Sequence, residues 1–363
     1  MRTIVISGIN LYEGGPLSIY YDCLDAVWRT GLYKEYRIIA FVHKKELFQK
    51  YKDIVKILEL PKSRRSYMHR LYYEYIFFHG FSKMHHIDVW FSLHDMTPFV
   101  KADRIYTYCH NPGPFMKKDI TKIKYSLKMV LFAFLYRYVY RINIASADAV
   151  IVQQDWMRQE FYKMYPVRNV IVARPDMPRA HEFTDRSRKN KKTVFIYAAY
   201  PRYFKNFEAV LDACWMLEHK EFHNFELWIT IDGTENKYAK ELYKKYSILN
   251  NVRWMGILDR NELFCRYEEA DCLVFPSLLE TWGLPVSEFK KTGKGMILAD
   301  LPYAHEALGS YDKVLFFDTD SVGSLAKAMA QVIRGSVCYM KVTEKAVKEP
   351  YAENWAELFQ MIL

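Results

Sequence analysis

Leu273-Val-Phe-Pro-Ser-Leu-Leu-Glu280-Thr-Trp-Gly-Leu-Pro-Val-Ser-Glu288 is the stretch from which the fold of this chain can be predicted. Its first residues are β-branched, aromatic or aliphatic and end at Pro276, which predicts a buried strand. A polar loop follows, and Gly283-Leu284-Pro285 predicts the start of a helix with proline in its first turn. Because a helix start presents free backbone N–H groups and a positive dipole end, this turn suits a phosphate group.

Two carboxylates flank this turn, Glu280 in the loop and Glu288 in the helix. Carboxylates in these places can accept hydrogen bonds from sugar and ribose hydroxyls while the helix amides face a diphosphate. Two helix-surface glutamates without a ligand would be the simpler interpretation of the spacing alone. The strand, the Pro-Ser pair and the Gly-Leu-Pro turn at these offsets favour a nucleotide-sugar site.

The same stretch resembles the donor-site signature of the retaining glycosyltransferases of family 4, in which Glu-x7-Glu follows a strand ending in Phe-Pro-Ser. The resemblance implies the α/β GT-B fold, with two Rossmann-like domains whose parallel sheets face each other across a cleft. It also implies roles for individual residues. Glu288 would bind ribose hydroxyls, Glu280 would bind the donor sugar, and Gly283, Leu284 and Pro285 would line the donor site.

The composition fits a globular protein of two domains, with 363 residues of which 51% are hydrophobic. A net charge of +10 suits an acidic or phosphorylated partner or an anionic membrane surface, whereas no nucleic-acid-binding motif accompanies it. The six cysteines form no C-x2-C pair, which favours reduced thiols in a cytoplasmic protein. The apolar runs are too short for a signal peptide or a membrane span.

The predicted N-terminal domain, residues 1–172, is expected to lie on the acceptor side and opens as a Rossmann-like unit. Strand Thr3–Ser7 leads through a turn containing Gly14 and Gly15 into a helix. The G-x-G-x-x-G pattern of dinucleotide sites is absent, so an ordinary tight turn remains the alternative. The resemblance places Gly14 and Gly15 near the donor phosphates and the acceptor.

Further strands alternate with helices in this domain and predict a parallel sheet whose ligands gather at the carboxyl ends of its strands. Two of these ends carry histidine, His94 and His110. The resemblance gives His110 a contact with the donor sugar, whereas His94 is left open between a functional and a structural role. The predicted strands are Tyr36–Val42, Val55–Leu60, Asp88–Ser92, Arg104–Cys109 and Ala149–Val152.

Two segments of this domain, Tyr67–Phe81 and Lys117–Ala145, mix basic and aromatic residues. Such helices can rest on an anionic bilayer surface, and a lipid-linked acceptor would make that position natural. Packed helices with a solvated basic face explain the same composition, and both interpretations stay open. The protein is therefore expected in the cytoplasm, with a peripheral position on the inner face of the cell membrane as an alternative.

A polar, charged stretch with two prolines predicts a linker over residues 173–192, followed by a nucleotide-sugar-binding Rossmann-like domain over 193–345. Residues 346–363 would form a C-terminal helix that packs back on the first domain, as in the resembling family. Gly233 is expected in the donor site, in the turn after the second strand of this domain. The predicted strands are Thr193–Ala199, Glu226–Ile231, Val252–Met255, Met296–Ala299 and Val314–Phe317.

Arg202 and Lys205 follow the first of these strands, where two cations could hold a diphosphate. The resembling family has an Arg and a Lys here, although Arg202 lies closer to Lys205 than is usual and Tyr200 occupies the more typical position. No Asp-x-Asp pair is placed to hold a metal, so the cations would offset the charge of the leaving group. Neither a metal nor a cofactor is predicted, and the nucleotide diphosphate sugar is itself a substrate.

The sequence thus predicts a retaining, metal-independent hexosyltransferase that uses a nucleotide diphosphate sugar. Its acceptor would be a saccharide or a lipid-linked glycan, in the assembly of a surface polysaccharide such as lipopolysaccharide. A nucleotide-sugar epimerase or hydrolase of the same fold and a catalytically silent carbohydrate-binding protein are the alternatives. The donor sugar, the base, the acceptor and the linkage are not specified by these residues.

Overall fold

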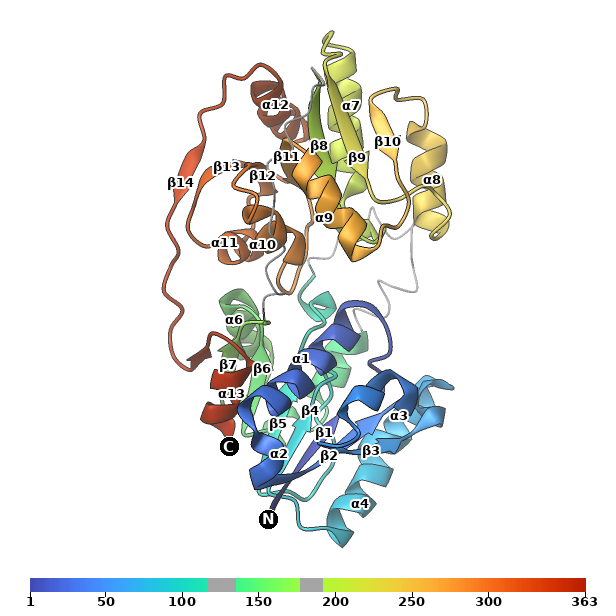
Figure 1. Cartoon of the computed structure of the whole chain (residues 1–363), viewed down its shortest axis with the longest axis vertical. Helices are drawn as coiled ribbons and strands as arrows, with labels where there is room; N and C mark the ends of the chain where they lie inside the picture. Colours follow the sequence, from blue (N-terminus) through green and yellow to red (C-terminus); the bar gives the residue numbers. More distant parts are fainter. Residues whose placement is uncertain (117–134, 177–191) are drawn as a thin grey trace. The chain divides into compact units, whose positions relative to one another are not determined.

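The computed structural model describes residues 1–116, 135–176 and 192–363, and these form two compact α/β units (Figure 1). The first unit contains residues 1–116, 135–176 and 347–363, and the second contains residues 192–346. Most of the predicted linker, residues 177–191, lies outside the described residues, as do residues 117–134 of the second basic-aromatic segment.

The first unit is built on an eight-stranded parallel sheet in the order β15-β7-β6-β5-β4-β1-β2-β3. Its strands are β1 (Arg2–Ser7), β2 (Tyr36–Val42), β3 (Lys56–Glu59), β4 (Val89–Ser92), β5 (Arg104–Tyr108), β6 (Ala149–Val152), β7 (Val170–Ala173) and β15 (Tyr351–Ala352). Its helices include α1 (Gly14–Thr30), α2 (Leu32–Glu35), α3 (Tyr67–Tyr72), a π-helix η3 (Tyr73–Phe77), α4 (Phe78–Met84), α6 (Asp155–Met164) and α13 (Trp355–Ile362).

Helices cover both faces of this sheet, so its strands are apolar on both sides. In β1, Ile4 and Ile6 join the core cluster beneath α1 and α13, whereas Val5 packs into the cluster that contains Phe78 and Trp90. This alternation follows the two-residue period of a strand. The buried sheet therefore fixes which loops emerge at the carboxyl ends of its strands.

The C-terminal segment returns to the first unit. Strand β15 pairs with β7, and α13 packs against α1. The ring of Trp355 in α13 stacks on that of Tyr108, with the centroids 5.2 Å apart and the planes 15° apart. The Asn354 side chain accepts the backbone N–H of Glu357 and so caps the helix.

The second unit has a seven-stranded sheet in the order β10-β9-β8-β11-β12-β13-β14, parallel except for the β13–β14 pair. Its strands are β8 (Thr193–Tyr197), β9 (Phe225–Ile229), β10 (Val252–Trp254), β11 (Cys272–Phe275), β12 (Gly295–Ala299), β13 (Tyr311–Phe317) and β14 (Met340–Val342). Its longer helices are α7 (Phe207–Glu218), α8 (Lys237–Tyr246), α9 (Arg260–Glu269), α10 (Leu284–Lys290), α11 (Pro302–Leu308) and α12 (Val322–Ile333).

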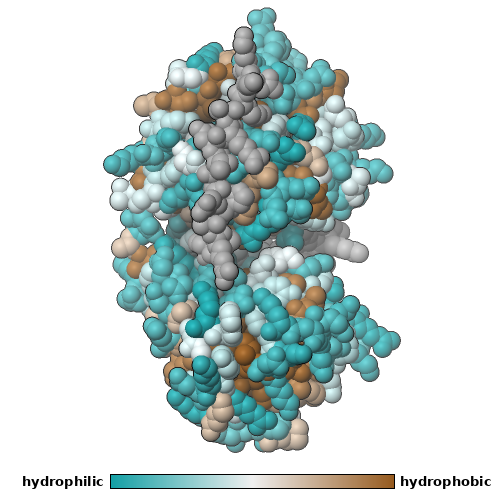
Figure 2. All heavy atoms as spheres, in the orientation of Figure 1, coloured by the Kyte–Doolittle hydropathy of each residue, from teal (hydrophilic) through white to brown (hydrophobic). Residues whose placement is uncertain are grey.

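The described part of the chain has no helix with both the length and the apolar character that crossing a membrane requires. On the face drawn in Figure 2, hydrophobic residues lie in small groups between hydrophilic ones. The surface shown there is therefore mixed rather than a continuous apolar band.

Candidate functional site

Three neighbouring strands of the second unit carry most of the predicted site residues. Lys205 follows β8, Gly233 follows β9, and Glu280 and Glu288 follow β11. Strands β9, β8 and β11 are adjacent and parallel, so their carboxyl ends lie at one edge of the sheet. Ligands of α/β sheets bind at such an edge.

Lys205 and Glu280 form an ion pair at this edge. Lys205 Nζ lies 2.5 Å from Glu280 Oε1, and the two side chains are 17% and 12% exposed. Tyr197 at the end of β8 donates its hydroxyl proton to the Lys205 carbonyl over 2.6 Å. The N–H of Leu278 donates to the carbonyl of Phe204 over 2.7 Å, which ties the loop after β11 to the loop after β8.

The loop after β11 is held from below by side chains of the unit. Tyr303 donates its hydroxyl proton to the Ser277 carbonyl over 2.6 Å, and the Trp282 indole N–H donates to Ser287 Oγ over 3.0 Å. Gly283 begins α10 at φ +90°, a backbone conformation that glycine adopts without strain. Leu284 and Pro285 form the first turn of α10, as predicted.

Glu288 is buried in α10 and has one charged partner that the sequence did not suggest. Arg260 Nη2 lies 3.1 Å from Glu288 Oε1. Burial raises the pKa of the Glu288 carboxyl, and Arg260 offsets part of this shift. Arg260 stands in the first turn of α9, which Asp259 and Glu262 cap reciprocally. The Asp-x-x-Glu capping box could have been read from the sequence, but the contact with Glu288 could not.

Arg202 and Gly233 are not part of the two ion pairs described above. The Arg202 side chain is exposed, and its guanidinium lies about 6 Å from the rings of Tyr200 and Phe204. The N–H of Gly233 already donates to Glu235 Oε2 over 3.1 Å. A Cβ at Gly233 would stand 2.7 Å from Tyr243 Cβ, so packing and its φ of +95° both require glycine here.

His110 of the first unit follows β5, and its closest charged partner is Asp95. His110 Nε2 lies 3.7 Å from Asp95 Oδ2, and its side chain is 11% exposed. Burial lowers the pKa of His110, Asp95 acts in the opposite direction, and the nearby His94 and Arg70 lower the pKa further. Among the described residues, the buried Nδ1 of His110 has no hydrogen-bond partner.

His94 lies in the interior between two charged side chains. Arg70 Nη2 lies 3.2 Å from His94 Nδ1. His94 Nε2 lies 2.9 Å from Glu74 Oε1, although this pair is not aligned as a hydrogen bond. This arrangement favours the structural alternative for His94.

Gly14 and Gly15 begin α1 and are exposed. A Cβ at either position would meet no atom within 4 Å. The φ of Gly14 is +62°, which explains glycine there, but Gly15 has no such conformation. Neither packing nor backbone geometry accounts for glycine at position 15.

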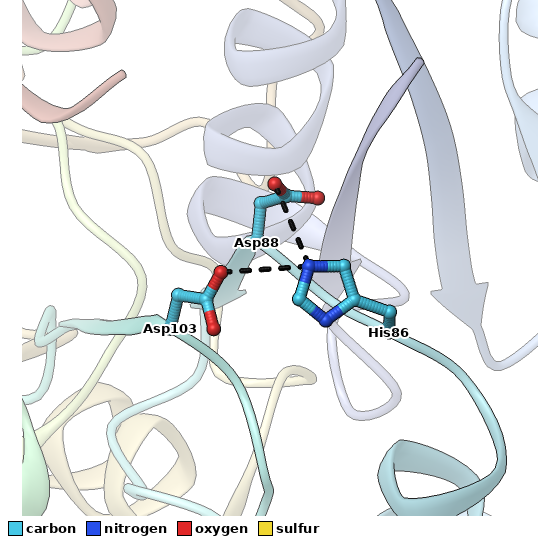
Figure 3. Close-up of side chains that lie close together, drawn as sticks. All are labelled: His86, Asp88 and Asp103. Carbon is cyan, nitrogen blue, oxygen red and sulfur yellow. Dashed lines mark ion pairs between the residues drawn. The ribbon is translucent and has the colours of Figure 1, made fainter.

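One group of three potential metal ligands lies within the described ranges, and it stands at the opposite ends of the sheet strands from His110. His86 Nε2 lies 4.0 Å from Asp88 Oδ1 and 3.6 Å from Asp103 Oδ2 (Figure 3). Asp88 and Asp103 precede β4 and β5, so the group stands at the amino ends of these strands. Asp88 Oδ2 already accepts the N–H of Thr3 over 2.7 Å. These side chains are well explained as a surface ion-pair group.

Comparison with known proteins gives a family match for part of the chain and a curated relative. Residues 179–349 match the family described as glycosyl transferases group 1. Glycogen synthase from Mycobacterium tuberculosis is 27% identical over 107 residues, which cover 30% of this chain and 26% of that protein. The match thus spans about a quarter of this relative's length.

Solved structures resemble nearly the whole chain at low sequence identity. Sucrose-phosphate synthase from Thermosynechococcus elongatus has a TM-score of 0.64 at 12% identity, covering 93% of this chain and 90% of that one. WaaG, a glycosyltransferase involved in lipopolysaccharide biosynthesis, has a TM-score of 0.63 at 15% identity and 91% coverage of both chains. HepE from Anabaena, solved with UDP and glucose, has a TM-score of 0.59 at 11% identity, covering 92% and 90%. The predicted GT-B fold is confirmed by these similarities.

Proposed function

We propose that this chain, whose residues 179–349 match the group 1 glycosyl transferases and which has the GT-B fold, transfers a hexose from a nucleotide diphosphate sugar to a saccharide or lipid-linked saccharide hydroxyl. The observation that carries the proposal is the ion pair of Lys205 and Glu280 at the carboxyl end of β8 and β11, in the same loop-helix unit as the buried Glu288. A cation and two carboxylates in this arrangement match the diphosphate and the hydroxyls of such a donor.

Each of these groups has a chemical role in the proposed reaction. Glu288 accepts hydrogen bonds from ribose hydroxyls, and Glu280 accepts them from the sugar. Lys205 and the exposed Arg202 hold the diphosphate, whose charge increases as the glycosidic bond breaks. The backbone amides of Gly283 and Leu284 face the same phosphates.

The family resemblance assigns roles to residues of the first unit as well. His110 contacts the sugar, and Gly14 and Gly15 line the junction of donor and acceptor. Retention of configuration then proceeds by attack on the same face from which the nucleotide leaves, and the departing phosphate takes the proton of the acceptor hydroxyl. This route needs no protein nucleophile and no metal, because Lys205 and Arg202 supply the positive charge.

The nature of the solved relatives supports the choice of substrates. HepE is solved with UDP and glucose, and WaaG is involved in lipopolysaccharide biosynthesis. A UDP-hexose is therefore the first donor to test, and a glycan of the cell surface is the first acceptor class. A lipid-linked acceptor would bring the protein to the inner face of the cell membrane.

The decisive experiment incubates the purified protein with UDP-hexoses, with and without candidate glycan acceptors, and measures released nucleotide and glycosylated product. A transferase releases nucleotide in step with product and only with acceptor present. Release of nucleotide without acceptor would instead establish a hydrolase, and binding without turnover would establish a silent carbohydrate-binding protein. The Glu288→Gln variant, prepared in parallel, identifies any activity that comes from a contaminant.

A further inference from the structure

We propose that Asp95 is the positioning residue of His110: it holds the loop that carries His110 and fixes the charge beside the imidazole ring. The consequence for turnover rests on the proposed function, but the contact itself lies wholly within the first unit. Asp95 is 6% exposed. The sequence did not single it out.

The backbone of Asp95 adopts an unusual conformation that aims its carboxylate at the next strand. Its φ is +72°, in the left-handed region that aspartate tolerates better than most side chains. Its N–H donates to the carbonyl of Tyr108 over 3.1 Å, at the end of β5. Non-glycine residues in this region persist where surrounding contacts hold them, often at functional sites.

One carboxylate oxygen of Asp95 accepts hydrogen bonds from three donors, two of which are backbone amides of the segment that contains His110. Oδ1 accepts the backbone N–H of His110 over 2.8 Å and that of Asn111 over 3.1 Å. The Tyr140 hydroxyl lies 2.9 Å from the same oxygen and 2.9 Å from the carbonyl of Asn111. A buried carboxylate that receives charge-assisted hydrogen bonds from two successive amides fixes the path of the loop.

The other oxygen faces the ring of His110. Oδ2 lies 3.7 Å from His110 Nε2, so its negative charge stabilises the protonated ring and attracts the Nε2 proton of the neutral ring. Among the described residues, His94 and Arg70 lower the pKa of this ring, and the ring of Tyr108 lies 6.4 Å from it. Asp95 is thus the group that raises the pKa of an imidazole whose burial lowers it.

A second layer of contacts holds the residue before Asp95. Arg70 Nη2 donates to the carbonyl of His94 over 2.7 Å and lies 3.2 Å from the Tyr136 hydroxyl. Burial lowers the pKa of Arg70, but Tyr136, Glu74, Tyr67 and Asp95 together raise it by more, so Arg70 remains charged. Glu74 comes from the π-helix η3, and such a helix is frequent at functional sites. Buried side chains of the first unit therefore hold the backbone at His94, which supports the left-handed conformation of Asp95.

The test replaces Asp95 by asparagine, which keeps the shape and tolerates the same φ but removes the charge. In an NMR titration of ¹⁵N-histidine-labelled protein, with His110 assigned by His110→Gln, the pKa of His110 is expected to be lower in Asp95→Asn than in the wild type. We also expect kcat to fall at least about tenfold, as for the loss of a charged hydrogen-bond partner, with nucleotide Kd unchanged. Asp103→Asn, which removes an exposed carboxylate at the other end of β5, is the charge-matched control and should change neither quantity.

An unchanged His110 pKa together with an unchanged kcat in Asp95→Asn would overturn the proposal, even if the wild type transfers sugar. A wild type that transfers no sugar would overturn the proposed function, while the titration still decides the contact. If Asp95→Asn does not fold, Tyr140→Phe takes its place. Loss of that one hydroxyl from Oδ1 should lower kcat severalfold without changing nucleotide Kd, and an unchanged kcat would refute the positioning role.

Discussion

Lys205 Nζ lies 2.5 Å from Glu280 Oε1, with both side chains mostly buried. Two residues assigned to different parts of the donor are thus each other's partner in the structure. A buried charge left without a partner is costly, so the contact holds both side chains in place. A diphosphate would offer Lys205 a stronger anion, and Glu280 would then be available for sugar hydroxyls.

Lys205→Ala is therefore expected to lower kcat by about 10²–10³, because the cation is most useful when charge develops on the leaving phosphate. Lys240→Ala, an exposed lysine of α8, removes the same charge and should leave kcat unchanged. Steady-state kinetics with saturating donor, beside thermal unfolding to exclude loss of fold, make the comparison. Equal small losses in both variants would mean that Lys205 contributes only general positive charge.

Glu288→Gln should weaken nucleotide binding and stabilise the second unit at pH 7. Ribose hydroxyls lose a charged acceptor, which corresponds to about 1.5–3 kcal/mol, or roughly 10- to 150-fold in Kd. Burial raises the pKa of the Glu288 carboxyl in the folded protein. This carboxyl therefore stabilises the fold at a pH below its ordinary pKa, and that stabilisation is lost as the pH rises through the raised pKa. Glutamine does not ionise, so the variant does not lose this stability at pH 7. The Arg260 side chain remains solvated because it is half exposed.

The measurements are calorimetric titration with UDP and thermal unfolding at pH 7 and pH 5. The midpoint difference between variant and wild type should shrink at pH 5, where more of the wild-type carboxyl is protonated. Glu241→Gln, on the exposed face of α8, is the control for a change of charge alone. Unchanged UDP affinity would remove Glu288 from the proposed donor site.

The stretch from Leu273 to Glu288 predicted the fold, which the solved structures confirm, and it lies within residues 179–349, which match the family described as glycosyl transferases group 1. The spacing of its residues describes a strand, a loop and a helix start that follow one another directly in the chain. Such local structure can be predicted from sequence. Most predicted strands also agree with the structure within a residue or two. The exceptions are short: β7 was not predicted, and β14 and β15 have too few residues to show a pattern.

The parts of the site that could not be predicted depend on contacts between segments that are far apart in the sequence. Glu288 could be identified from its spacing, but its partner Arg260 comes from α9 and meets it only in the folded unit. His94 could not be assigned because Arg70 and Glu74, which enclose it, belong to α3 and η3. Asp95 was missed for the same reason, since its donors come from the loop after β5 and from Tyr140.

Turnover should survive EDTA, because in the proposed mechanism the positive charge at the leaving group comes from Lys205 and Arg202. His86, Asp88 and Asp103 are the group of potential metal ligands in the described residues (Figure 3). A variant of this group therefore checks whether a cation bound there affects turnover. His86→Ala should leave both kcat and the response to EDTA unchanged. Loss of activity on chelation, restored by manganese or magnesium, would contradict a metal-independent mechanism.

Exposed apolar residues in the first basic-aromatic segment and its neighbourhood predict binding to anionic vesicles. Met68, Ile76 and Met84 are 71%, 62% and 75% exposed, and Lys62, Arg64 and Arg65 lie just before α3. Each basic residue near the membrane surface adds about 1 kcal/mol to the free energy of binding, and burial of one aliphatic side chain in the bilayer adds about 1.5 kcal/mol.

Co-sedimentation with phosphatidylglycerol vesicles should show binding that weakens at high salt and falls roughly tenfold in Ile76→Gln. Ile248→Gln, at an isoleucine of the second unit that is 78% exposed, is the matched control. Tyr136 and Tyr140 of the other basic-aromatic segment are buried, so they serve the core rather than a bilayer. Absence of binding at low salt would leave only the solvated-face interpretation.

Gly15→Ala is expected to separate function from stability. A Cβ at position 15 meets no atom within 4 Å, and its φ is not positive, so the fold does not require glycine. Alanine in a helix is more stable than glycine by about 0.5–1 kcal/mol, so the free energy of unfolding should stay equal or rise slightly. If a substrate approaches the backbone here, the added methyl group instead obstructs it, and kcat/KM falls.

Gly80 provides the matched control for this experiment. It lies in α4, and a Cβ there likewise meets no atom within 4 Å. Gly80→Ala should give a similar change in stability and no change in transfer to a water-soluble acceptor. If Gly15→Ala and Gly80→Ala both retain full kcat/KM, the turn before α1 lies outside the reaction, and the glycine at position 15 needs another explanation. A selective loss in Gly15→Ala places a substrate at the start of α1.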